Sequence, residues 1–127
     1  MNTITKNTTH ISAVRAQQIS QMQAVCEALR WTEEQYCLHQ FEEYELFASA
    51  IAKDYPERRQ QIRYSPVFRG FFNNEWAARN DEFLFFAYDV KYDIDLAEQE
   101  YLYTHNYLTL INDDAFFERF NSLLKLI

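Results

Sequence analysis

Glycine and proline are almost absent from this chain. Its 127 residues include one glycine, Gly70, and two prolines, Pro56 and Pro66. Sheet proteins of this size need many tight turns, and tight turns draw on Gly, Asn and Pro. The scarcity of turn residues therefore predicts an all-α fold with few connections. The length fits one helical domain, over residues 11–127, that can bury a core without disulfides or metals.

Apolar residues at intervals of three and four predict two long helices in the first half of the chain. A polar stretch over residues 1–10 precedes them, and we expect it to be disordered or frayed. The first helix covers about residues 11–30. The second begins after Thr32, which forms a capping-box pattern with Gln35, and runs to about Asp54. Because the link is very short, the pair is predicted to form an antiparallel hairpin. The inward stripes are Ile19, Met22, Cys26 and Leu29, then Cys37, Phe41, Tyr44, Ala48, Ile51 and Tyr55.

The two prolines predict where the next helices begin. Pro56 ends the second helix and starts a short third one. Ser65 followed by Pro66 is typical of an N-cap and the first position of a fourth helix. This helix is predicted to carry a buried aromatic face, widened by Phe71 and Phe85. The face consists of Phe68, Phe72, Trp76, Arg79, Phe83 and Phe86, at separations of 4, 4, 3, 4 and 3 residues.

Arg79 interrupts this aromatic face. A buried guanidinium is costly unless it is paired, although its stem can also lie along the rings with the head group in water. Glu75, Asp81 and Glu82 are partners close in sequence, and a carboxylate from another helix or another chain is an equal alternative. We therefore expect the stretch to be mainly core, with Arg79 and Trp76 as its least explained members.

Residues 88–95 alternate strictly between apolar and polar side chains, which is the period of a strand. Since no partner strand is found in the chain, we predict a short extended connector, and pairing with a second copy is the alternative. Asp95 is predicted to cap a fifth helix over about residues 96–111. Asn112 or Asp113 is predicted to cap the last helix. The expected architecture is thus an irregular bundle of five to six helices.

The net charge of −7 is confined to the second half of the chain. Residues 1–70 carry 8 basic and 8 acidic side chains, and residues 71–127 carry 4 basic and 11 acidic ones. Such a chain is repelled by phosphate backbones and anionic lipid heads at long range. With no membrane-length apolar run and no signal core, we expect a cytoplasmic protein without membrane contact. Cys26 and Cys37 are then two small buried thiols, with a redox-formed cross-link between the first two helices as the alternative.

No pattern in the sequence predicts catalytic, cofactor-binding or metal-binding residues. His10, His39 and His105 form no Glu-x-x-His or His-x-x-x-His pair. A single glycine excludes both glycine-rich nucleotide motifs. Cys37 and His39, two residues apart on a helix, point away from each other. A site assembled from distant residues is invisible at this level, so the sequence leans against an enzyme without excluding one.

A non-enzymatic protein-interaction or assembly module, oligomeric or part of a complex, is the main functional hypothesis. It rests on the many aromatic residues, on the segregated charge and on the lack of a catalytic pattern. The first alternative is a nucleic-acid accessory protein with an arginine and aromatic belt over residues 53–69. The second is a ligand-binding protein or enzyme with a pocket near Arg79. The candidate interaction residues are Arg58, Arg59, Arg63, Arg69, Trp76 and Arg79.

Overall fold

The computed structural model describes the backbone of residues 2–90 and 93–127 and the side chains of residues 13, 15–90 and 93–127. These ranges contain helices and no strand, which confirms the predicted all-α class. No helix in them is both long and apolar enough to cross a membrane. The elements are α1 (Asn2–Leu29), α2 (Glu33–Asp54), the 3-10 turn η1 (Pro56–Arg58), α3 (Arg59–Tyr64), α4 (Pro66–Ala78), α5 (Asn80–Asp89), α6 (Ile94–Thr104), α7 (Tyr107–Ile111) and α8 (Asp114–Lys125).

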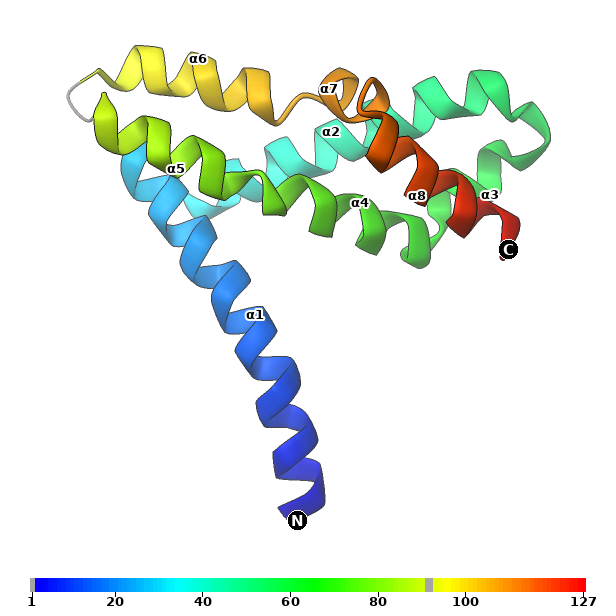
Figure 1. The fold of residues 1–127 in the computed structure, drawn as a ribbon, viewed down its shortest axis with the longest axis horizontal. Coiled ribbons are helices and arrows are strands. Elements are labelled where there is room, and N and C mark those ends of the chain that lie inside the picture. The colour runs from blue at the N-terminus through cyan, green and yellow to red at the C-terminus, as the bar shows by residue number, and fades with distance from the viewer. Residues whose placement is uncertain (1, 91–92) are drawn as a thin grey trace.

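The helix α2 lies at the centre of the bundle. It packs on α1, α3, α4 and α7, whereas α5 packs on α1 and α6. In Figure 1, α4 and α5 follow each other along one side and α6 and α7 along the other. The link at residues 30–32 brings α1 against α2, as the predicted hairpin requires. However, α1 also packs on α5 and α6, and it projects away from the other helices in Figure 1.

Local sequence signals set the helix ends. Thr32 and Gln35 form the predicted capping box, with bonds of 3.1 and 2.7 Å. Ser65 accepts a hydrogen bond from the Phe68 N–H, and Asp113 accepts one from the Ala115 N–H, so both predicted caps are confirmed. The cap predicted at Asp95 is wrong, because α6 begins two residues earlier and Asp93 caps it. These bonds satisfy N–H groups that the helices themselves leave unpaired.

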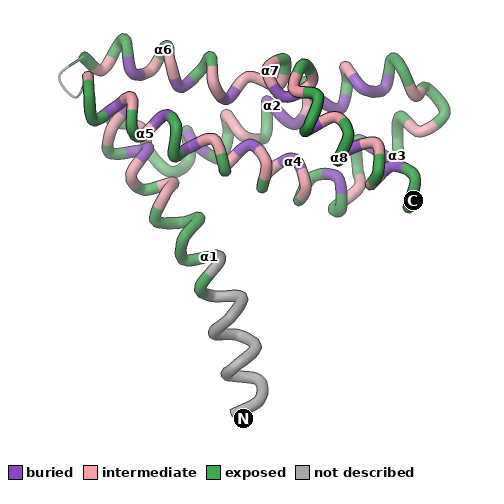
Figure 2. Tube along the Cα trace, viewed as in Figure 1, coloured by how far each residue is buried: buried purple, intermediate pink, exposed green. Residues whose placement is uncertain are grey.

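Aromatic rings fill the core, as predicted. The Phe47 ring packs on Phe72, Phe116 and Phe120 with centroids 5.0, 5.7 and 5.4 Å apart. The tilted and edge-on geometry is the one that aromatic pairs prefer. Figure 2 shows the buried residues on the inner sides of the helices. The predicted aromatic face is also internal, since Phe68, Phe72, Trp76 and Phe83 are fully buried.

Some members of the predicted stripes face water instead. Phe85 is 76% exposed, so its assignment to the buried face is wrong. Ile19 and Phe41 are 41% and 47% exposed, and Cys37 is exposed as well. All three lie where α1, α2 and α4 diverge and leave the ends of their stripes uncovered.

The aromatic face is divided between two helices. The Arg79 N–H bonds to the Trp76 carbonyl oxygen at 3.3 Å, which tightens the turn and ends α4 at Ala78. The break turns Asn80 into the core, where its amide donates to the Tyr36 hydroxyl at 3.0 Å. A buried side-chain hydrogen bond thus accompanies the break in the helical path.

The connector and the fifth helix also differ from the prediction. Residues 88 and 89 belong to α5 and residues 94 and 95 to α6, so the link is limited to residues 90–93, of which 91–92 lie outside the described part. The helix predicted over 96–111 breaks at residues 105 and 106, because the Asn106 side chain caps a separate α7. The first helix also begins earlier than predicted, at Asn2 instead of near residue 11, so α1 includes backbone from the stretch expected to be disordered or frayed.

Candidate functional site

Two arginines of the predicted belt are used inside the chain. Arg58 donates to the carbonyl oxygen of Leu124 at 2.7 Å, at the C-terminal end of α8, where carbonyl groups lack helical partners. Arg63 pairs with Glu45 at 3.0 Å. A nucleic-acid surface over residues 53–69 would have to compete with both contacts.

Arg79 and Trp76, the members of the aromatic face that the sequence explained least, have structural roles. Arg79 pairs with Asp113 at 3.0 Å, which ties the junction of α4 and α5 to the N-cap of α8. Its partner is thus a carboxylate from another helix, one of the alternatives left open by the sequence. Trp76 is fully buried and donates from Nε1 to the His105 carbonyl oxygen at 3.0 Å. Trp76 therefore has no surface to offer a partner of the folded chain.

Arg59 and Arg69 face solvent. Arg59 forms none of the ion pairs found among the described residues. The Arg69 guanidinium lies over the rings of Phe41 and Tyr44, 5.0 and 5.4 Å from their centroids. This cation–π contact holds the charge at the surface between α2 and α4. Of the six candidate interaction residues, Arg69 is the one that lines a hollow in the described surface of the protein.

This hollow belongs to a groove between α1, α2 and α4. Two adjoining hollows of about 460 and 220 Å³ form it, and both are lined by Cys37, Gln40 and Asn73. No carboxylate lines either hollow in the described part of the chain, although the chain is strongly acidic. The polar side chains along this α1–α2–α4 groove include two arginines and four amides, namely Arg15, Arg69, Gln18, Gln40, Asn73 and Asn74.

Gly70 lies on the α4 wall of the groove. A Cβ atom at this position would meet nothing within 4 Å. Glycine inside a helix is less stable than alanine by about 0.5–1 kcal/mol, because its backbone loses more freedom on folding. The packing of the chain itself therefore gives no reason for its one glycine, and the missing side chain widens the groove.

The outer side of α5 presents the opposite charge. Five exposed residues recur at positions i, i+1, i+4, i+7 and i+8, which places them on one helical face. Phe85 and Tyr88 are 76% and 71% exposed, and three carboxylates flank the two rings. This outer α5 face consists of Asp81, Glu82, Phe85, Tyr88 and Asp89, of which Asp81 also accepts a hydrogen bond from Gln21 on α1 at 3.0 Å.

A cluster of buried and half-buried polar side chains joins α2 to the C-terminal end of α6. Tyr101 stacks on His105, with centroids 4.1 Å apart, and His39 packs on Tyr101 at 5.9 Å. The Tyr101 hydroxyl and Nε2 of both histidines have no hydrogen-bond partner in the described part. Burial lowers the pKa of His105 to about 3 and raises the pKa of Tyr101, so both are uncharged at neutral pH.

Glu43 is a buried carboxyl group on α2, one helical turn after His39. It is 6% exposed and accepts a hydrogen bond from the Tyr107 N–H at the start of α7. Burial raises the pKa of Glu43 to about 7. A catalytic acid or base must reach its substrate, and none of Glu43, Tyr101 and His105 lines any of the three cavities described here. We therefore interpret this cluster as part of the packing.

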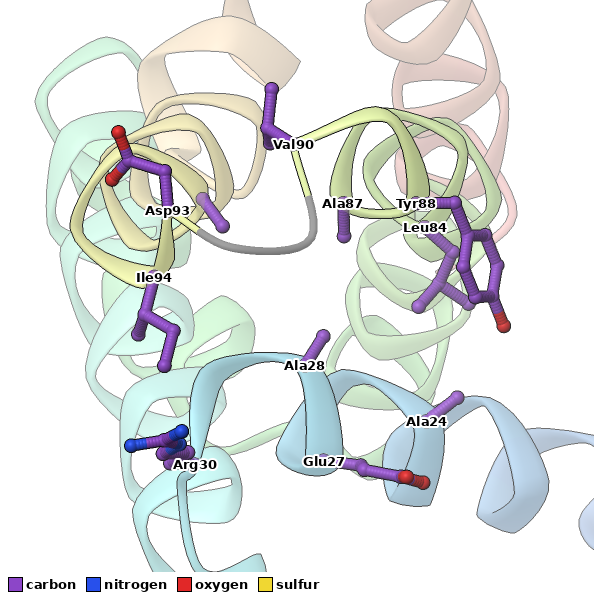
Figure 3. A pocket seen from close by; sticks show the side chains of 11 residues that line it. Ala24, Glu27, Ala28, Arg30, Leu84, Ala87, Tyr88, Val90, Asp93 and Ile94 are labelled. Atoms are coloured by element: carbon purple, nitrogen blue, oxygen red, sulfur yellow. The ribbon is translucent and has the colours of Figure 1, made fainter.

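A separate pocket of about 310 Å³ lies between α1, α5 and α6. Figure 3 shows Ala28, Ala87 and Ile94 pointing into it, with Arg30 at one end and Tyr88 at the other. Its lining combines apolar side chains with three charged ones, Glu27, Arg30 and Asp93. Arg79 does not line this pocket or either hollow of the groove, so none of the three is the pocket predicted near Arg79.

The thiols and carboxylates offer no metal centre among the described residues. No three His, Cys, Asp or Glu side chains there lie close enough together to hold an ion. Both cysteines are free thiols. Cys26 is buried, donates to the Thr32 carbonyl oxygen at 3.6 Å and has a raised pKa because of its burial. Cys37, in contrast, is exposed in the α1–α2–α4 groove.

Sequence reasoning missed the groove and the outer α5 face, although each leaves a signal. Gly70 is the only glycine and lies within a predicted helix. Phe85 and Tyr88 lie three residues apart with carboxylates around them, a pattern that also fits an outward face. Comparison of the chain with protein-family models, curated proteins and solved structures found no match.

Proposed function

We propose that this protein is a non-enzymatic assembly module that associates with itself from head to tail. In this arrangement the α1–α2–α4 groove of one copy receives the outer α5 face of the next. Opposite charge is the observation that carries the proposal. The groove has two arginines and no carboxylate in the described part, and the outer α5 face has three carboxylates and no cation. Complementary charges speed encounter and select the partner.

Apolar contact supplies the affinity in this proposal. Phe85 and Tyr88 expose most of their rings, and burying one such side chain contributes about 1.5–3 kcal/mol. The open position at Gly70 lets the backbone of an incoming helix approach α4 closely, as small residues do in other helix pairs. Gln40 and Asn73 can bond polar groups of the incoming helix, whereas Gln18 on α1 already donates to Asn74 on α4 at 3.0 Å.

The two surfaces lie on different helices, so the contact is heterologous. Such contacts extend into open chains unless the rotation between copies closes a ring. A single helix seated in a groove buries less area than a standard interface, and we therefore expect weak, concentration-dependent association.

Sedimentation velocity tests the proposal on the full chain. The wild-type protein is expected to form species larger than a monomer as its concentration rises from about 1 μM to about 1 mM, the range of weak complexes. Raising the salt from about 0.05 M to about 0.5 M shortens the screening length and should lower the association. Gly70→Trp fills the groove and Phe85→Arg changes the outer α5 face, and each is expected to leave a monomer.

Two measurements make the test specific. Thermal unfolding is expected to show that both variants fold, because Gly70 faces open space and Phe85 is exposed. Tyr103→Arg is the matched control, since Tyr103 is a 68% exposed ring in the same acidic half but lies on α6. A wild-type monomer at about 1 mM, or equal loss of association in the Tyr103 variant, would refute the proposal.

A further inference from the structure

We infer that the pocket between α1, α5 and α6 binds a medium-chain carboxylate, for which octanoate is the simplest probe. The pocket is separate from the α1–α2–α4 groove and shares no lining residue with it. The inference rests on the apolar centre of the pocket, on one cation at its end and on its volume. Tyr88 belongs both to the rim of this pocket and to the outer α5 face, so the binding test is made on dilute, monomeric protein, where self-association does not affect it.

Short side chains create the space. Protein interiors are close-packed, so a hollow of this size between three helices is uncommon. Leu84 and Ile94 complete the apolar wall, and Figure 3 shows Ala28, Ala87 and Ile94 directed toward its centre. Larger residues at the alanine positions would fill the hollow. The four alanines are Ala24 and Ala28 on α1, Ala87 on α5 and Ala97 on α6.

Arg30 places a positive charge at one end of the pocket. It forms none of the ion pairs found among the described residues. Glu27 and Asp93 also belong to the rim, but in Figure 3 Glu27 extends away from Arg30 and the Asp93 carboxylate points away from the centre. Asp93 is also engaged as the cap of α6, where it accepts from the Leu96 N–H at 2.9 Å. The guanidinium is therefore the charged group left for a ligand, and carboxylates match its geometry.

The backbone of Arg30 adds a second reason to assign a role to this side chain. Its φ of 56° is the only positive value among the non-glycine residues in the described ranges. The bonds from the Arg30 N–H to the Glu27 oxygen and from the Trp31 N–H to the Cys26 oxygen form a Schellman motif, in which glycine is the usual residue. Arginine is less favourable than glycine there, so a ligand contact would explain why a long cationic side chain occupies the position.

The volume limits the size of the ligand. At about 30 Å³ for each water-sized group, the pocket of about 310 Å³ holds about ten non-hydrogen atoms. Octanoate has this many, with an alkyl chain for the alanine-lined centre and a carboxylate for Arg30. Pockets for small ligands begin at about this volume and are mainly apolar with a few polar groups.

Isothermal titration calorimetry on the full chain tests the inference with three probes of equal length: octanoate, octanol and octylammonium. Octanoate is expected to bind at one site, at least tenfold more tightly than octanol, and octylammonium is expected not to bind. Equal affinity for octanoate and octylammonium, or no heat with octanoate, would overturn the inference.

Variants of Arg30 separate binding from folding. Arg30→Gly is expected to raise the melting temperature, because the left-handed position suits glycine, and to weaken octanoate binding at least tenfold. Arg30→Lys keeps the charge and is expected to retain most of the binding. Ala28→Leu fills the centre and is expected to abolish binding, and its melting curve shows whether it folds. Unchanged octanoate affinity in Arg30→Gly would place the ligand elsewhere and overturn the assignment.

Discussion

Glu43 makes the stability of this protein depend on pH in a way that one substitution can isolate. Burial raises its pKa from 4.5 in the unfolded chain to about 7 in the folded one. Between these values the folded protein holds a proton that the unfolded chain releases. The free energy of unfolding must therefore fall as the pH rises from about 4.5 to about 7, and it stays low above that range. The gap corresponds to about 3 kcal/mol.

Glu43→Gln removes this titration and keeps an acceptor for the Tyr107 N–H. We expect the variant to exceed the stability of the wild type by less than about 1 kcal/mol at pH 5 and by up to about 3 kcal/mol at pH 9. Urea unfolding followed by circular dichroism at pH 5, 7 and 9 measures the difference. Glu42→Gln is the matched control, because Glu42 is the neighbouring exposed carboxylate on the same helix.

The buried His105 and the half-buried His39 act in the opposite direction. The pKa of His105 is lowered to about 3 and that of His39 is also lowered, mainly by burial in both cases. The neutral histidines contribute to stability above pH 6.5, the pKa of histidine in the unfolded chain. This contribution is lost as the pH falls toward their lower pKa values in the folded protein. Both histidines are common to the wild type and the Gln variant, so the difference between the two reports on Glu43. Parallel stability curves from pH 5 to 9 would refute the reasoning.

Four further predictions concern stability and reactivity. Gly70→Ala is expected to raise the free energy of unfolding by about 0.5–1 kcal/mol in denaturant titrations, because the new methyl group meets open space. Thr32→Ala removes the capping box and should lower the free energy of unfolding by about 1 kcal/mol, and an unchanged value would contradict the cap. Phe47→Ala should lower the free energy of unfolding by about 3–5 kcal/mol, since the ring is fully buried among other rings. Cys37 should react with a thiol reagent in the native protein, whereas Cys26 should react only on unfolding, as mass spectrometry of the labelled peptides would show.

The parts of the fold that depend on neighbours in sequence were predictable. At the caps Thr32, Ser65 and Asp113, the side chain accepts a hydrogen bond from a backbone N–H no more than three residues later. The burial of the aromatic rings in the fourth predicted helix was predictable because they recur at intervals of three and four residues. Such local patterns constrain backbone and burial without knowledge of distant contacts.

The features that were missed depend on contacts between distant residues. The break at Arg79 accompanies the bond between Asn80 and Tyr36, which are 44 residues apart, and the partner of Arg79 is Asp113, 34 residues away. Residues at the ends of the predicted stripes, such as Phe41, are exposed because α1 leaves the bundle. No interval in the sequence specifies that direction, so the sequence offered Gly70 as a signal within α4 but not the groove between α1, α2 and α4.

The most direct test of self-association is sedimentation velocity on an equimolar mixture of the Gly70→Trp and Phe85→Arg proteins. Each is expected to be monomeric alone. In the mixture, the intact outer α5 face of the first fits the intact groove of the second, and the remaining surfaces of the pair are blocked. A discrete 1:1 dimer is the predicted result. A mixture that sediments as monomers, under conditions in which the wild type associates, would contradict the account.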